Sequence, residues 1–166
     1  MNKRSTLASA TGLLVSLALT ACAGGPSIPE SRTPSSSPSI SRATAEARTG
    51  EVQRRITDAF PSGSIATNDT GRWTLLACSD TEVSAGGGAS ITLTREVDVD
   101  ATYGAITEAL RGDDYTSATT TTRKGATRLT VTGQDDDQYL ITIYNDTRTV
   151  QISSFSPCFP GSLTDE

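Results

Sequence analysis

The feature that most constrains the fold is a change in sequence character near residue 44. Before it, the chain carries one apolar run at residues 7–19 and then a stretch of Ser, Pro and Gly with hardly an apolar side chain. Such a stretch buries too little surface to offset the entropy lost on ordering. We therefore expect one compact domain built from residues 45–161, followed by a flexible tail at 162–166.

The first 21 residues have the order of a secretory signal. Lys3 and Arg4 precede the apolar run, and small residues follow it. A membrane-spanning helix needs about 20 apolar residues, whereas this run is shorter and is interrupted by Ser9 and Thr11. Residues 1–21 are therefore predicted to be a signal peptide that is removed on export.

The signal ends in Leu19, Thr20, Ala21 and Cys22, which resembles the lipobox of bacterial lipoproteins. The resemblance implies cleavage before Cys22 and acylation of its thiol. Two or more acyl chains anchor a protein stably, so we expect attachment to the cell membrane on its extracytoplasmic face. The alternative is an ordinary signal peptide, cut near Ala21 or Ala23, with no role for Cys22.

Residues 22–44 are expected to form a disordered tether that holds the domain away from the lipid. A linker of this Ser/Pro-rich composition reaches about 25 Å as a coil and about 65 Å when stretched. Its Ser and Thr residues beside Pro could also accept sugars, a question that the sequence leaves open.

Two amphipathic helices are expected in the domain. Residues 45–60 carry apolar side chains at helical spacing and end before Pro61, with Gly50 weakening the first turns. Asp100 is predicted to cap a second helix at residues 101–111, whose end is marked by Gly112.

The remaining segments read as antiparallel strands. Residues 72–79 are apolar on both faces, as in a buried strand, and glycines 86–88 are predicted to form a turn before a strand at 89–97. A meander follows, with strands at 115–122, 127–132, 139–144 and 149–155. The predicted fold class is α+β, with two helices on one face of an antiparallel sheet of about five to six strands.

Cys78 and Cys158 are expected to form one disulfide. Both follow the export signal, and exported proteins meet an oxidising compartment. Closing so long a loop stabilises a fold by about 4 to 5 kcal/mol in the chain-entropy estimate. A reactive thiol at Cys78 is the rival interpretation.

The composition excludes several classes of function. The chain has no His, which removes Ser-His-Asp and Cys-His mechanisms. Without residues 1–21 it has 12 basic and 19 acidic residues, a net charge of −7 that disfavours nucleic acid as a partner.

Acidic residues offer two weaker candidates. Asp135, Asp136 and Asp137 are adjacent but lack the spacing of a calcium loop, so no metal site is predicted and the three are expected to be solvated. A hydrolase that uses two carboxylates is the enzyme class left open, although no spacing selects a pair among Glu82, Glu96, Asp98, Asp100 and Glu108.

The whole layout looks like that of small actinobacterial lipoproteins, the mycobacterial LppA type among them: a lipobox, a Ser/Pro tether and a Thr-rich domain with Trp73, Cys78 and Cys158. The likeness beyond the lipobox lies in organisation, and only Cys22 carries over as a site residue. Trp73 is expected to be a core aromatic beside the disulfide rather than part of a sugar or lipid groove.

We therefore expect a non-catalytic binding or structural module of the cell envelope, without a cofactor, whose partner is an envelope protein or a wall component. The alternatives are a carrier or sensor of an apolar ligand, which needs a cavity between helices and sheet, and the carboxylate-based hydrolase.

Overall fold

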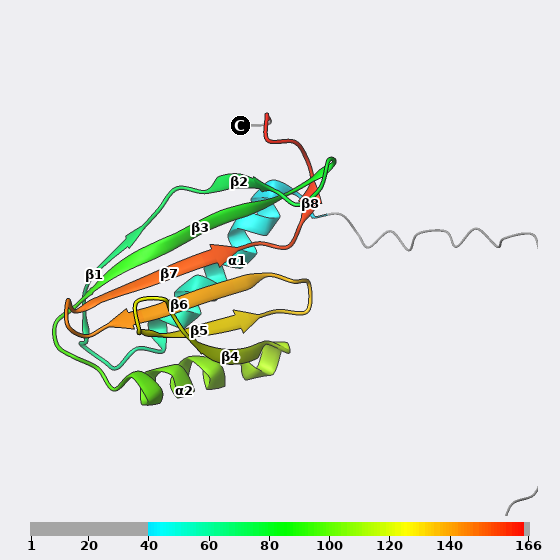
Figure 1. Ribbon diagram of the computed structural model, residues 1–166. Coiled ribbons are helices and arrows are strands. Elements are labelled where there is room, and N and C mark those ends of the chain that lie inside the picture. Colours follow the sequence, from blue (N-terminus) through cyan, green and yellow to red (C-terminus); the bar gives the residue numbers. More distant parts are fainter. Residues whose placement is uncertain (1–39, 165–166) are drawn as a thin grey trace, which may run out of the picture. The chain divides into compact units, whose positions relative to one another are not determined.

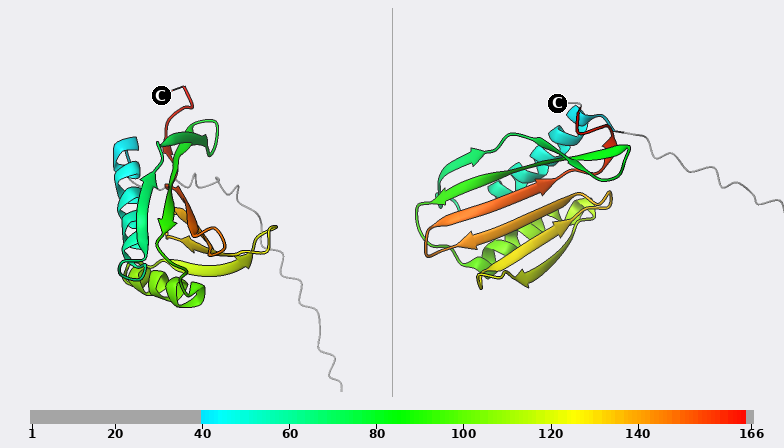
Figure 2. Two further views of the ribbon diagram at one scale, coloured as in Figure 1. Left: turned by 90° about the vertical axis from the view of Figure 1, so that its left-hand side faces the viewer. Right: turned by 45° about the horizontal axis from the view of Figure 1, so that its top comes forward.

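The computed structural model describes residues 40–164, which fold into two helices and an antiparallel sheet of eight strands. Both helices cover the same face of the sheet, and no described helix covers the other face (Figures 1 and 2). The predicted α+β class is confirmed. The predicted signal peptide, Cys22 and most of the predicted tether lie outside the described residues.

The strands follow the order β1-β3-β7-β6-β5-β4 across the sheet, and β2 and β8 also pair with β3. Their bounds are β1 Ile65–Thr70, β2 Thr74–Ala77, β3 Glu82–Leu93, β4 Thr116–Thr121, β5 Thr127–Thr132, β6 Gln138–Tyr144, β7 Thr149–Phe155 and β8 Phe159–Pro160. The expected meander is present as β4 to β7. The sheet has eight strands because β1 and the short β8, neither of which was predicted, also join it.

Helix α1, Arg42–Asp58, begins three residues before its predicted start. The reason is Ser41, whose hydroxyl accepts a hydrogen bond from the Thr44 amide at 3.2 Å and so caps the helix. Gly50 does not delay the start and lies inside the helix, where a Cβ would stand at an ordinary contact distance of 3.8 Å from the Trp73 ring.

Helix α2, Val99–Leu110, is capped by Asp98 and not by Asp100 as predicted. The Asp98 carboxylate accepts from the Ala101 amide at 2.9 Å, and Asp100 lies in the first turn. The helix also ends before Gly112, because a 3-10 turn, η1 Arg111–Asp113, follows it and Asp114 takes the left-handed conformation.

The predicted turn at Gly86–Gly88 is wrong, since these glycines lie inside the twelve-residue strand β3. The chain reverses earlier, where the amides of Cys78 and Ser79 both donate to the Glu82 carbonyl. A Cβ atom at Gly87 would stand 2.5 Å from the Trp73 ring, and one at Gly88 would overlap the Ile152 carbonyl oxygen. The glycines permit close packing, not chain reversal.

Strand β2 is an edge strand rather than one buried on both faces. Leu75 is buried, whereas Leu76 is 40% exposed. Trp73 lies just before β2 and is partly buried against a small core. The prediction that it packs in the core is therefore confirmed, although it does not lie on a central strand.

The apolar side chains form two cores on the helix side of the sheet. The larger core fills the space between α1, α2 and strands β3, β5, β6 and β7. The smaller core joins the start of α1 to β2, β8 and the beginning of β3, with these buried members: Ala45, Leu75, Val83, Ala85 and Phe159. Both cores lie within the described residues, so a fragment 40–166 carries every side chain that these two cores list.

The disulfide between Cys78 and Cys158 is present, with Cα atoms 6.3 Å apart. It joins the β2–β3 connection to the segment between β7 and β8, and both cysteines are exposed. The bond therefore fastens the smaller core, the part of the fold with the fewest buried side chains.

We predict that Gly88→Ala destabilises the fragment 40–166 by about 2 to 4 kcal/mol, because the added methyl group overlaps backbone that cannot move without breaking the β3–β7 pairing. Gly104→Ala is the matched control: Gly104 lies in α2 with no atom near its missing Cβ, so the change should stabilise by about 0.4 to 1 kcal/mol. Urea unfolding measures both. Equal stability of the two variants would refute the close-packing role of Gly88.

Candidate functional site

The uncovered face of the sheet carries polar side chains in rows that cross the strands. The strand register sets Thr67, Thr92 and Thr149 side by side in one row. The next row consists of Asp69, Ser90, Gln151, Thr142, Arg128 and Thr120. Among the threonines of β4 and β5, Thr120, Thr130 and Thr132 lie on this uncovered face, whereas Thr119 lies opposite Leu129 and shares the covered face.

Two hydrogen bonds order the second row. The Gln151 amide donates to the Ser90 hydroxyl at 3.1 Å, and the Arg128 guanidinium donates to the Thr142 hydroxyl at 3.4 Å. Thr142 is buried although it lies on the uncovered face. The face is therefore an organised polar surface.

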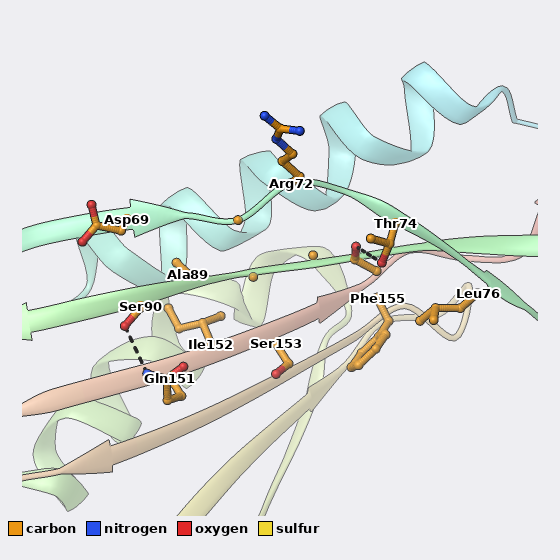
Figure 3. Close-up of a pocket in the computed structure, with 14 residues that line it drawn as sticks. Asp69, Arg72, Thr74, Leu76, Ala89, Ser90, Gln151, Ile152, Ser153 and Phe155 are labelled. Carbon is orange, nitrogen blue, oxygen red and sulfur yellow. Dashed lines mark hydrogen bonds between the residues drawn. The ribbon is translucent and has the colours of Figure 1, made fainter. Parts of the chain in front are cut away.

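A groove of about 510 Å³ crosses this face over the glycines of β3 (Figure 3). Asp69, Ser90 and Gln151 lie at one end, and Leu76 and Phe155 lie together at the other. The floor is low because Gly86 and Gly88 have no side chains there. The groove thus offers hydrogen-bonding groups at one end and an aromatic ring at the other.

A second cleft, also of about 510 Å³, opens on the helix side between α1 and the residues Tyr115, Asp137 and Tyr139. Asp137 is only 7% exposed, so the prediction that all three aspartates are solvated is wrong for this one. The Tyr115 hydroxyl donates to the Asp137 carboxylate at 2.9 Å. Asp135 is exposed and lies 3.5 Å from Arg48.

Both tyrosines of this cleft have raised pKa values. Burial raises the pKa of Tyr115 to about 12, and the hydrogen bond to Asp137 adds to the effect. Burial also raises the pKa of Tyr139, again with a contribution from the Asp137 charge. The two phenols are therefore protonated near neutral pH and act there as hydrogen-bond donors, not as bases.

Thr49 on α1 completes the cleft. Its hydroxyl is buried and makes no well-formed hydrogen bond within the described part of the chain, although it lies close enough to lower the pKa of Tyr139 slightly. Beside it, Ser154 donates to the Gln53 side chain at 3.0 Å. The contact between α1 and the sheet is thus partly polar in this region.

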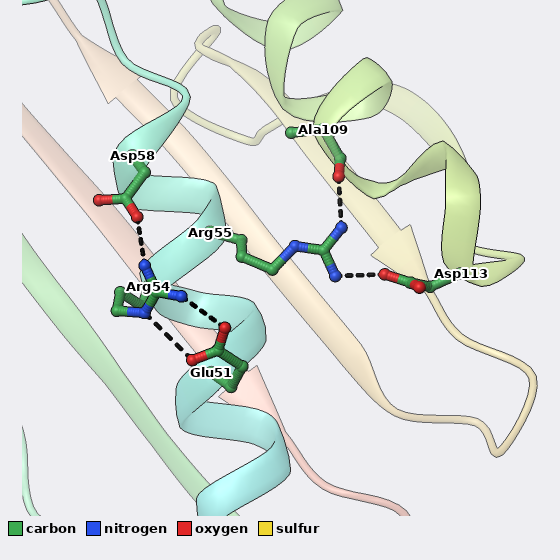
Figure 4. Close-up of polar contacts among 6 residues, drawn as sticks. All are labelled: Glu51, Arg54, Arg55, Asp58, Ala109 and Asp113. Carbon is green, nitrogen blue, oxygen red and sulfur yellow. Dashed lines mark hydrogen bonds and ion pairs between the residues drawn. The ribbon is translucent and has the colours of Figure 1, made fainter.

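Charged groups tie α1 to the end of α2 (Figure 4). Arg55 donates to the Asp113 carboxylate and to the Ala109 carbonyl. Arg54, the residue before Arg55 in α1, contacts Glu51 and Asp58 of its own helix and points away from Arg55. Arg55 therefore closes one wall of the cleft, and its guanidinium is engaged there.

The structure does not bring the candidate hydrolase carboxylates together in either the groove or the cleft. All five are exposed; Asp98 caps α2 and Glu108 pairs with Arg111 at 2.7 Å. Residues 40–164 contain no cluster of three or more Cys, Asp or Glu that could hold a metal ion. No helix within that range is long and apolar enough to cross a membrane.

Comparisons with known proteins return no match to a family model, a curated protein or a solved structure. Sequence reasoning had missed the groove, because it placed a turn at Gly86–Gly88. The available signal was the alternation of residues 149–155, which sets Gln151, Ser153 and Phe155 on one face of a strand.

We predict that Asp137→Asn lowers the pKa of Tyr115 from about 12 toward its ordinary value, while burial keeps it above 10. Because the pKa is raised in the folded state, the corresponding stability is full below pH 10 and is lost as the pH rises toward 12. Carbon NMR of the tyrosine rings during a pH titration measures the shift. Asp135→Asn is the control and should leave Tyr115 unchanged; an unshifted Tyr115 in Asp137→Asn would contradict the assignment.

Proposed function

We propose that the protein is a lipid-anchored, non-catalytic binding module of the cell envelope, and that its uncovered sheet face binds a wall polysaccharide through the groove over Gly86–Gly88. The observation that carries the proposal is the groove itself. It combines planar or hydroxylic polar side chains with a half-buried aromatic ring. Sugars present hydroxyl groups and apolar ring faces together, and such a surface can pair with both.

The shape of the face supports a long polymer rather than a compact protein. The polar rows extend beyond the groove across the sheet, so a chain of sugars would meet hydrogen-bonding groups along its length. The only large apolar side chains at the groove are Leu76, Ile152 and Phe155, and Ile152 is buried. A stable protein interface has an apolar, well-packed centre, which this face offers only around Leu76 and Phe155.

The two alternative functions receive less support. A carrier of an apolar ligand needs apolar space between helices and sheet. The larger core fills most of that space, and the helix-side cleft beside it carries the charged residues Arg48, Glu51 and Asp137. A carboxylate-based hydrolase needs two acids in one cleft. The helix-side cleft instead holds Asp137 among phenol groups that are protonated donors near neutral pH.

We predict that Ser153→Tyr, which places a ring in the groove, weakens binding of fragment 40–166 to purified wall polysaccharide of the host by about tenfold or more. Ala105→Tyr adds the same ring at an exposed position of α2, on the covered side of the sheet, and should bind like the unmodified fragment. Isothermal titration calorimetry measures both. No binding by the unmodified fragment, or an equal loss in both variants, would reject the polysaccharide groove.

We predict that protein extracted from the host's membrane fraction has the mass of residues 22–166 plus acyl groups. Reduction should add two hydrogen atoms, as the Cys78–Cys158 bond requires. Intact-protein mass spectrometry makes the measurement. A Cys22→Ala variant should keep residues 1–21 and carry no acyl group; an unacylated wild-type mass in the culture fluid would overturn the anchor.

A further inference from the structure

The two edges of the sheet differ in how they are protected against pairing with another strand. The β1–β2 edge has a register irregularity between Ile65 and Thr67, an acidic side chain at Asp69 and a break at Gly71–Trp73. Charges, irregular register and short strands are the usual means of blocking an edge. This edge is therefore poorly suited to accept a further strand.

Strand β4 at the opposite edge has none of these features. Its six residues, Thr116–Thr121, are uncharged, contain no Pro and pair with β5 in an unbroken register. All six are exposed, and the strand forms the outer edge of the sheet in the right-hand view of Figure 2. Among the described strands, only β5 pairs with β4, so the backbone groups on its outer side have no partner strand there.

The register identifies which groups face outward. The Thr122 amide donates to the Ala126 carbonyl at 2.8 Å, so Thr122 and Ala126, which face each other beside the β4–β5 turn, form a hydrogen-bonded pair. Hydrogen-bonded pairs alternate along an antiparallel ladder. Thr116, Ala118 and Thr120 therefore bond to β5, whereas the backbone groups of Ser117, Thr119 and Thr121 point to the open edge.

The charges at the two ends of β4 complement each other. Asp113 and Asp114 precede the strand, and Arg123 and Lys124 follow it. When a second β4 lies antiparallel across a two-fold axis normal to the sheet, the acidic end of each strand meets the basic end of the other. Asp113 is already paired with Arg55, so the favoured register has its axis at Thr119, which sets Asp114 opposite Lys124.

We infer that β4 is a self-association edge, at which two copies of this chain pair antiparallel and join their sheets into one. Both uncovered faces then lie on the same side of the joined sheet. Six residues per strand make a small interface, so the dimer is weak in solution. This inference does not depend on the proposed function; if that also holds, the anchor raises the local concentration and the dimer presents two grooves to one polymer.

Thr119→Pro tests the inference at the backbone. Proline removes the outward-pointing amide but no bond to β5, and edge strands tolerate proline when that amide faces solvent. We predict that this variant of fragment 40–166 keeps its fold and associates at least about tenfold more weakly than the unmodified fragment. Thr119→Ala keeps the amide and should associate normally. Sedimentation equilibrium measures association, and circular dichroism checks the fold.

Charge reversal tests the partner and the direction of pairing. Asp114→Lys should weaken association by about threefold to tenfold, and adding Lys124→Glu in the same chain should restore it. Higher salt should weaken the unmodified dimer. The inference is overturned if the fragment stays monomeric up to about millimolar concentration, which is the effective concentration that a short flexible tether gives two partners. Normal association of a folded Thr119→Pro variant also overturns it.

Discussion

The close approach of β3 to its neighbours is the constraint on which the rest of the structure depends. This strand pairs with β1 and β2 along one side and with β7 and β8 along the other. Side chains at Gly86–Gly88 would collide with Leu76, with Trp73 and with the backbone of β7. Gly87 leaves room for the Trp73 ring, and Gly88 lets the backbone of β7 approach closely. Gly86 and Gly88 also lower the floor of the groove on the uncovered face.

The sequence predicted those parts of the fold whose patterns are local. Strands β5 and β7 match their predicted bounds, because their alternating apolar and polar residues fit a sheet with one covered face. The disulfide was predicted from the compartment and the cysteine count. The helix caps were harder, because Asp98 and Asp100 are equally plausible until the chain's exit from β3 is known.

The errors at Gly86–Gly88 and at Asp137 share one physical cause, which is tertiary contact that overrides local preference. Glycine favours turns because of its conformational freedom, yet at Gly86–Gly88 the space demanded by Trp73 and Leu76 decides the residue type. Asp137 looks like a loop acid, yet the hydroxyl of Tyr115, distant along the chain, gives it a buried partner. The candidate groove could not be seen from the sequence because its walls come from β2, β3 and β7 together.

The uncovered face also explains how a chain with 35% apolar residues builds a stable domain. Both cores lie on the helix side, so each strand needs to bury only every second side chain. The other face is then free to carry Thr, Ser and Gln in ordered rows without a cost in core volume. Because Thr is β-branched, it suits a strand even where it remains exposed. A domain economical in apolar side chains therefore gains a broad polar surface whose residues can vary while the cores stay unchanged.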